Sequence, residues 1–154
     1  MTNKDIDWVI HYAQEHDCDY CGKHNENSIG LSGFANIHTH GLDVYNHKEI
    51  CIPIDIGNVA GIIINDCGLK IKFNKEKFEP GLKFGVIKDY PVLFYEFEKE
   101  SDTLYMFLPD KYGRFPINED CEFPFNQQKF YASIIEEENK EIKKEILRRK
   151  NYEQ

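Results

Sequence analysis

The chain has 154 residues, of which 41% are hydrophobic and 30% charged, so it is long enough to bury one core and too short for a large barrel. The net charge of −8 disfavours nucleic acid as a partner, because phosphate binding requires a basic patch. The apolar runs are too short to span a bilayer, and the polar start does not resemble a signal peptide. The five cysteines are an odd number, which indicates thiols or metal ligands in a reducing compartment. We therefore expect a cytoplasmic protein without a membrane segment.

The first predicted element is a helix that begins near Thr2 and ends near His16. Its apolar positions recur at helical spacing, and Thr2 with Asp5 resembles a capping box. Residues 17–33 are mostly polar and contain three glycines, which indicates a loop. Two strands are then expected, at residues 34–40 and 50–56, on either side of a short connection.

The middle of the chain is predicted to contain one helix and an antiparallel meander. The stretch from Gly57 to Ile71 fits either a strand or a helix, and we favour a helix that stops at Gly68. Residues 83–88, 92–99 and 103–108 are predicted as strands. A loop bounded by proline and glycine follows from Pro109 to Pro116.

From Asn126 onward the sequence predicts a long amphipathic helix. Asn126 is a suitable cap, and an apolar stripe runs from Phe130 to Ile146. Its second half has too few apolar residues to stand alone in water, so we expect a homodimer in which Ile142 and Ile146 contribute to the interface. The predicted fold class is α+β: a mostly antiparallel sheet with an N-terminal helix, one internal helix and a long C-terminal helix. The predicted division is a single domain at 1–125 and the helix at 126–154.

The stretch GFANIHTHGLDVYNHKE, residues 33–49, contains the first candidate metal site. His38 and His40 are two apart, so in a strand both imidazoles lie on one face. Zinc requires three or four converging donors, and His47, Glu49 or Asp43 could complete the set across the turn. With His47 as the third ligand, Glu49 is the candidate general base. The alternative reading is that both histidines are neutral and hydrogen-bonded in the wall of the domain, and this reading is favoured.

A second candidate metal site is Cys18, Cys21 and His24. Two cysteines with this spacing form half of a zinc ribbon, but the sequence has no second such pair. The alternatives are an unliganded loop, which is favoured, structural zinc and a redox pair.

Asp110 and Arg114 flank Gly113 in the Pro109–Pro116 loop. They are predicted to form an ion pair that fastens the loop, with a substrate clamp as the alternative.

Three motifs in order resemble a bacterial family known as domain of unknown function four-two-six-two. They are GFANIHTHGLDVYNHKEICI, KFEPGLKFGVIKDYPVLF and FLPDKYGRFPINEDCEFPF, and together they cover roughly residues 33–125. The resemblance implies a small cytosolic bacterial domain without an assigned reaction. If the family shares an activity, it points to His47, Glu49, Asp110 and Arg114 as candidate catalytic residues rather than to His38 and His40.

Two functional classes follow from the sequence. The favoured one is a non-enzymatic binding or accessory module for a protein or small molecule, with no cofactor. The alternative is a metal-dependent hydrolase-like enzyme that uses zinc held by His38, His40 and His47.

Overall fold

The structure is a computed structural model, and it describes residues 3–13, 35–97, 102–128, 131 and 144. Within these residues a short 3-10 turn, η1 (Asn3–Asp5), precedes the strands β1 (Val9–Ala13) and β2 (Asn36–His40). A second 3-10 turn, η2 (Leu42–Tyr45), leads to β3 (Glu49–Ile52) and the helix α1 (Asn58–Asn74). The chain continues through β4 (Gly81–Lys83), β5 (Val92–Tyr95), β6 (Thr103–Phe107) and the turn η3 (Phe125–Gln127).

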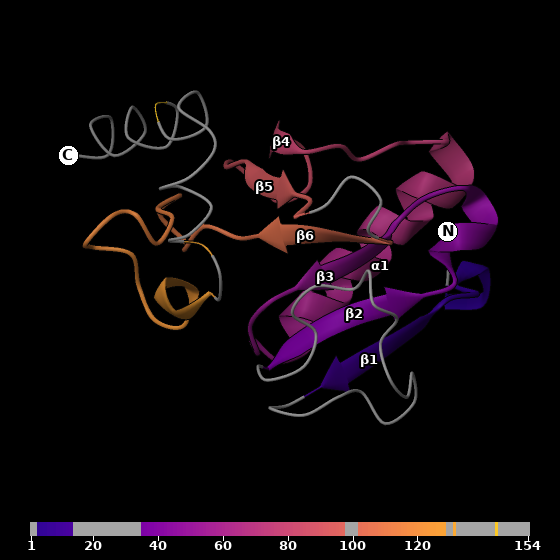
Figure 1. The fold of residues 1–154 in the computed structure, drawn as a ribbon, viewed down its shortest axis with the longest axis horizontal. Coiled ribbons are helices and arrows are strands. Elements are labelled where there is room, and N and C mark those ends of the chain that lie inside the picture. Colours follow the sequence, from indigo (N-terminus) through magenta and orange to yellow (C-terminus); the bar gives the residue numbers. More distant parts are fainter. Residues whose placement is uncertain (1–2, 14–34, 98–101, 129–130, 132–143, 145–154) are drawn as a thin grey trace.

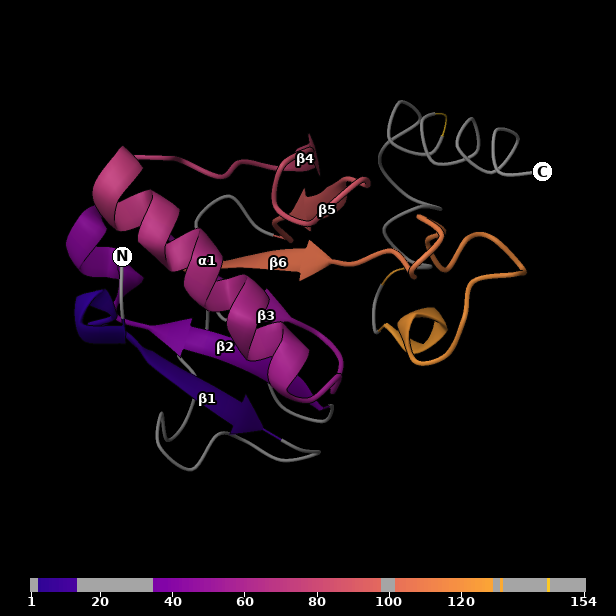
Figure 2. The ribbon, with the colours of Figure 1, turned by 180° about the vertical axis from the view of Figure 1, so that it is seen from behind.

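The strands of the described residues form one six-stranded sheet in the order β1-β2-β3-β6-β5-β4. Only the pair between β3 and β6 in this sheet is parallel. The helix α1 lies across one face of the sheet, behind β2, β3 and β6 in Figure 1 and in front of them in Figure 2. The fold is therefore α+β, with a mixed and mostly antiparallel sheet and one internal helix.

Two apolar clusters hold the sheet, one on each face. The larger cluster packs α1 against side chains such as Ile37, Ile50 and Met106. Successive side chains of a strand point to opposite faces of the sheet, so these side chains lie on the face that α1 covers. The smaller cluster, on the opposite face, includes Cys51, Tyr105 and Phe107. Tyr131 also belongs to it, and its ring stacks on that of Phe115 with 5.9 Å between the centroids.

The predicted N-terminal helix is wrong, because residues 9–13 form the strand β1. This strand pairs with β2 over five positions, from Val9 opposite His40 to Ala13 opposite Asn36. The segment from Trp8 to Tyr12 is rich in aromatic and β-branched residues, which suit a strand. The pairing with β2 therefore decides against the local helical spacing.

The internal helix is confirmed, but its predicted end at Gly68 is wrong. α1 continues to Asn74, and Lys75 takes the left-handed conformation that closes it. Gly68 is buried inside the helix because the ring of Trp8 packs directly against it. A Cβ at this position would lie 2.3 Å from Cζ2 of Trp8. Gly68 thus serves close packing, not helix termination.

The remaining strands agree with the prediction in position more than in length. The meander of β4, β5 and β6 is antiparallel, as predicted. However, residues 84–88 are not extended as a strand, since positive φ angles at Gly85 and Asp89 turn the chain. The third strand ends at Ile52, before Pro53, rather than at Ile56.

The predicted C-terminal helix falls almost entirely outside the described residues. Asn126, expected as its cap, lies inside the 3-10 turn η3. No helix among the described residues is long and apolar enough to cross a membrane.

Candidate metal site

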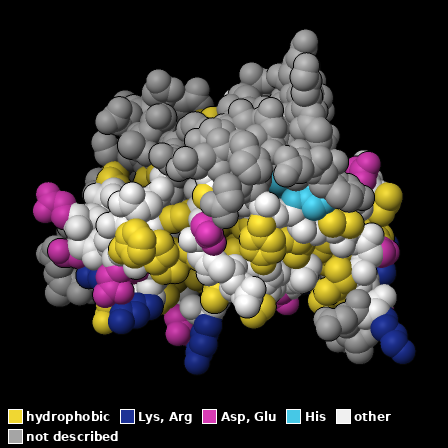
Figure 3. Space-filling model, turned by 90° about the horizontal axis from the view of Figure 1, so that it is seen from below, with side chains coloured by type: hydrophobic (Ala, Val, Ile, Leu, Met, Phe, Trp, Pro, Cys, Tyr) yellow, Lys and Arg dark blue, Asp and Glu magenta, His cyan; other side chains and the backbone are white. Residues whose placement is uncertain are grey.

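Three histidines from the first two strands converge on the sheet face opposite α1. His11 of β1 lies directly opposite His38 of β2 in the strand pairing. His40 follows His38 by two residues and therefore projects on the same side. Figure 3, viewed from the β1 side, shows a patch of histidine atoms, in cyan, at the surface.

The rings of His11, His38 and His40 are close enough to share one ion. Their centroids are 5.4 Å apart for His11 and His38, 4.7 Å for His11 and His40, and 5.2 Å for His38 and His40. One ligand nitrogen from each ring lies within 4.8 Å of the others. Tetrahedral zinc with bonds of about 2.1 Å holds its ligand atoms about 3.4 Å apart. Inward shifts of roughly 1 Å would therefore complete the coordination.

Burial affects the protonation of His11, one of the three rings. His11 and His38 are buried, and His40 is half-buried. Burial lowers the pKa of His11, and the charge of His40 lowers it further. An unprotonated imidazole is the form that donates to a metal ion, so the lowered pKa of His11 favours its role as a ligand.

Asn36 contacts His38 from the same strand face. The Nδ1 atom of His38 lies 2.6 Å from the Oδ1 atom of Asn36, and both residues are almost completely buried. The thiol of Cys51, which lies opposite His38 on β3, also donates to this oxygen at 3.9 Å. Burial raises the pKa of this thiol well above its ordinary value, so Cys51 stays protonated.

His47, the third ligand expected from the sequence, is placed differently. Its Nδ1 lies 2.7 Å from the carbonyl oxygen of Lys48, and its Nε2 accepts a hydrogen bond from the backbone N–H of Phe78 at 3.0 Å. Burial lowers the pKa of His47, so the ring is neutral with its hydrogen on Nδ1. Among the described residues the cluster able to hold a metal contains His38 and His40, with His11 in the place where we had expected His47.

Glu49 caps the turn that follows β2. Its carboxylate accepts hydrogen bonds from the Thr39 hydroxyl at 2.9 Å and from the backbone N–H groups of Leu42 and Gly41 at 3.1 and 3.2 Å. Burial raises its pKa, although these three donors act in the opposite direction. Both carboxylate oxygens of Glu49 therefore accept hydrogen bonds that hold this turn.

A cavity of about 930 Å³ adjoins the histidine cluster. His40 lines it, together with His47, Lys48, Glu49, Phe78 and Glu96. Lys48 and Glu96 form an ion pair of 2.8 Å within this lining. His40 thus belongs both to the three-histidine cluster and to a space that a small molecule can enter.

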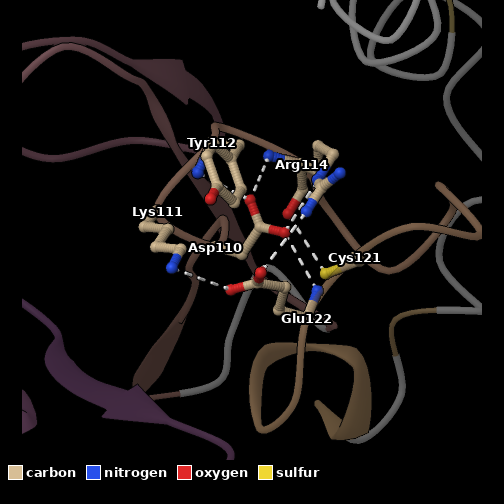
Figure 4. Close-up of polar contacts among 6 residues, drawn as sticks. All are labelled: Asp110, Lys111, Tyr112, Arg114, Cys121 and Glu122. Carbon is tan, nitrogen blue, oxygen red and sulfur yellow. Dashed lines mark hydrogen bonds and ion pairs between the residues drawn. The ribbon is translucent and has the colours of Figure 1, made fainter.

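Asp110 and Arg114 form the predicted ion pair within their loop, in a different part of the molecule. Figure 4 shows the Asp110 carboxylate surrounded by donors: the backbone N–H groups of Tyr112, Arg114 and Glu122, each at 2.9 Å, and Nε of Arg114, also at 2.9 Å. Burial would raise the pKa of Asp110, but these hydrogen bonds outweigh it and lower the pKa. The Arg114 guanidinium also stacks over the Tyr112 ring at 4.7 Å. Both charged groups are therefore engaged by residues of the segment from Asp110 to Glu122.

The second candidate metal site, Cys18, Cys21 and His24, lies outside the described residues. His11 is the residue of the cluster that the sequence reasoning missed, since we placed it on a helix. The aromatic and β-branched character of residues 8–12 was the signal that could have identified its strand.

A scan against family models and searches of curated proteins and of solved structures found no match to this chain.

Proposed function

We propose that this protein is a metal-binding module that holds a divalent transition-metal ion through His11, His38 and His40. The observation that carries the proposal is the convergence of their ring nitrogens to within 4.8 Å. Imidazole donors suit zinc, copper, nickel or iron and do not suit magnesium or calcium, which prefer oxygen ligands. Zinc is the leading candidate because three neutral nitrogens match its preferred ligand set.

The alternative reading, in which the histidines are ordinary neutral wall residues, explains less of the geometry. Three adjacent imidazole rings gain little hydrophobic stabilisation from their contact with one another. Protonation of one ring also makes protonation of the next less favourable, because the positive charges repel. Burial, and next the charge of His40, lowers the pKa of His11. A bound cation interacts favourably with the lone pairs of all three neutral rings at once.

The favoured role is binding rather than catalysis, as a ligand-binding or accessory module. A second candidate role, a metal-dependent hydrolase, is favoured by one observation: His40 also lines the 930 Å³ cavity. A zinc ion held by three histidines keeps a fourth position for water or substrate, where it acts as a Lewis acid. Glu49 is a weak candidate for the general base, since three donors already engage its carboxylate.

The setting of the module is also part of the proposal. We propose a reducing, cytoplasmic location, supported by the free thiols of Cys51, Cys67 and Cys121. The homodimer through Ile142 and Ile146 and the kinship with the family of unknown function remain proposals that rest on the sequence.

Zinc binding by the purified chain tests the proposal. We expect equilibrium dialysis with elemental analysis to find about one zinc ion per chain, as a single site requires. Replacing His11, His38 or His40 with Gln removes a direct ligand. Loss of a residue that only supports a ligand lowers metal affinity by roughly 10–100-fold, so the zinc affinity of each of these variants should fall by more than that.

Two controls separate this site from the other candidates. His47→Gln and the double variant Cys18→Ser with Cys21→Ser should bind zinc as the wild type does. Zinc binding that survives loss of His11 and His38 but disappears with Cys18 and Cys21 would refute the three-histidine site.

A further inference from the structure

The side-chain oxygen of Asn36 lies 2.6 Å from the Nδ1 atom of the candidate metal ligand His38. We infer that Asn36 is a positioning residue that fixes the ring of His38 so that its Nε2 atom faces the metal. This inference rests on the proposed metal site, and it adds a residue that touches no metal itself.

The hydrogen bond between Asn36 and His38 sets the tautomer. An amide oxygen only accepts hydrogen bonds, so the Nδ1 atom of His38, 2.6 Å from Oδ1 of Asn36, carries the hydrogen. A neutral imidazole has one N–H, and the other nitrogen is then the lone-pair donor. A metal bound by His38 is therefore bound through Nε2.

The surroundings of Asn36 hold its amide in this orientation. The side chain is 2% exposed, so water does not compete for the oxygen. The Cys51 thiol, fully buried on the neighbouring strand, donates to the same oxygen. The donor role of this thiol does not depend on the tautomer of His38, and it favours the oxygen over the amide nitrogen at that place.

The arrangement matches the general chemistry of histidine ligands. A ligating histidine usually donates its second N–H to an oxygen acceptor, which orients the ring and makes the ligating nitrogen more basic. Both residues lie on β2, two positions apart, so one strand supplies the ligand and its support. Asn36, His38 and His40 therefore lie on one face of β2, and all three belong to the proposed site.

Two substitutions test the role of the acceptor. Asn36→Leu keeps the approximate size and removes the oxygen, so zinc affinity should fall by about 10–100-fold. Asn36→Asp keeps an oxygen acceptor for Nδ1–H and should retain zinc binding within a few-fold of the wild type. Gln128→Leu is the matched control, because it removes a buried amide that bonds the backbone of Leu108 and contacts none of the three histidines. It should leave zinc affinity unchanged.

The tautomer itself gives a readout that does not depend on the variants folding. Long-range ¹H–¹⁵N spectra of the metal-free wild type, with His38 assigned by comparison with His38→Gln, should show its hydrogen on Nδ1. Hydrogen on Nε2 would overturn the inference, as would wild-type zinc affinity in a folded Asn36→Leu variant. Absence of zinc binding in the wild type would instead refute the proposed function, while the tautomer result would still report on Asn36.

Discussion

Substituting Gly68 with Ala should destabilise the protein and loosen the strand that carries His11. Trp8, three residues before His11, packs its ring on Gly68 and donates from Nε1 to Asn65 at 2.9 Å. These contacts dock the start of β1 onto α1. A methyl group at position 68 would lie 2.3–2.8 Å from three ring atoms of Trp8, closer than packed atoms tolerate.

The size of the effect follows from two opposing contributions. Overpacking a buried site costs about 1–3 kcal/mol, and the upper end applies because a rigid indole ring is the obstacle. Alanine in a helix interior is favoured over glycine by about 1 kcal/mol. The net loss should be roughly 2 kcal/mol of unfolding free energy, or about 4–8 °C in melting temperature for a chain of this length.

Gly61→Ala provides the matched control in the same helix. There the new methyl group would lie 2.9 Å from the hydroxyl oxygen of Tyr12, the far end of an exposed side chain that can move aside. The helix preference should then dominate and leave the variant as stable as the wild type or more stable. Urea denaturation followed by the fluorescence of Trp8, the single tryptophan, measures both variants. Equal stability of the two variants would refute the packing argument.

Two further predictions concern other parts of the fold. Burial lowers the pKa of His47 below its usual 6.5; the hydrogen bond to the Lys48 carbonyl opposes this shift, and the charge of Lys77 adds to it. The contribution of the neutral ring to stability is therefore present above about pH 6.5 and is lost as pH falls. In metal-free protein, the difference in unfolding free energy between wild type and His47→Gln should therefore shrink from pH 7 to pH 5, and a difference constant over this range would contradict the assignment. Asp110→Asn leaves buried N–H donors without their carboxylate and should cost about 3 kcal/mol, whereas Arg114→Ala should cost about 1 kcal/mol. Zinc affinity should be unchanged in both loop variants, and a large loss in either would show that the loop takes part in the site.

The sequence predicted the α+β class and the strand face shared by His38 and His40, because both depend on local alternation. It also predicted the Asp110–Arg114 pair, whose partners are four residues apart. The third histidine was missed for a physical reason. The spacing of Ile6, Val9 and Ile10 suits a helix locally, and only the pairing with β2 makes the segment a strand.

The role of Gly68 was missed for the same kind of reason. A glycine near the end of an apolar helical stretch usually stops the helix. Here its partner, Trp8, is sixty residues away along the chain, so the need for a bare backbone is visible only in the fold. The parallel pairing of β3 with β6, which brings Cys51 opposite Tyr105, is likewise a long-range feature.

The central claim is that His11, His38 and His40 hold the metal, and X-ray absorption at the zinc edge of the zinc-loaded chain tests it most directly. We expect a first shell of nitrogen or oxygen atoms at about 2.0–2.1 Å, with the outer-shell scattering of three imidazole rings. The same spectrum from His11→Gln should lose one imidazole or the metal altogether. Sulfur atoms at about 2.3 Å in the wild type would place the zinc on cysteines, and that result would contradict the account.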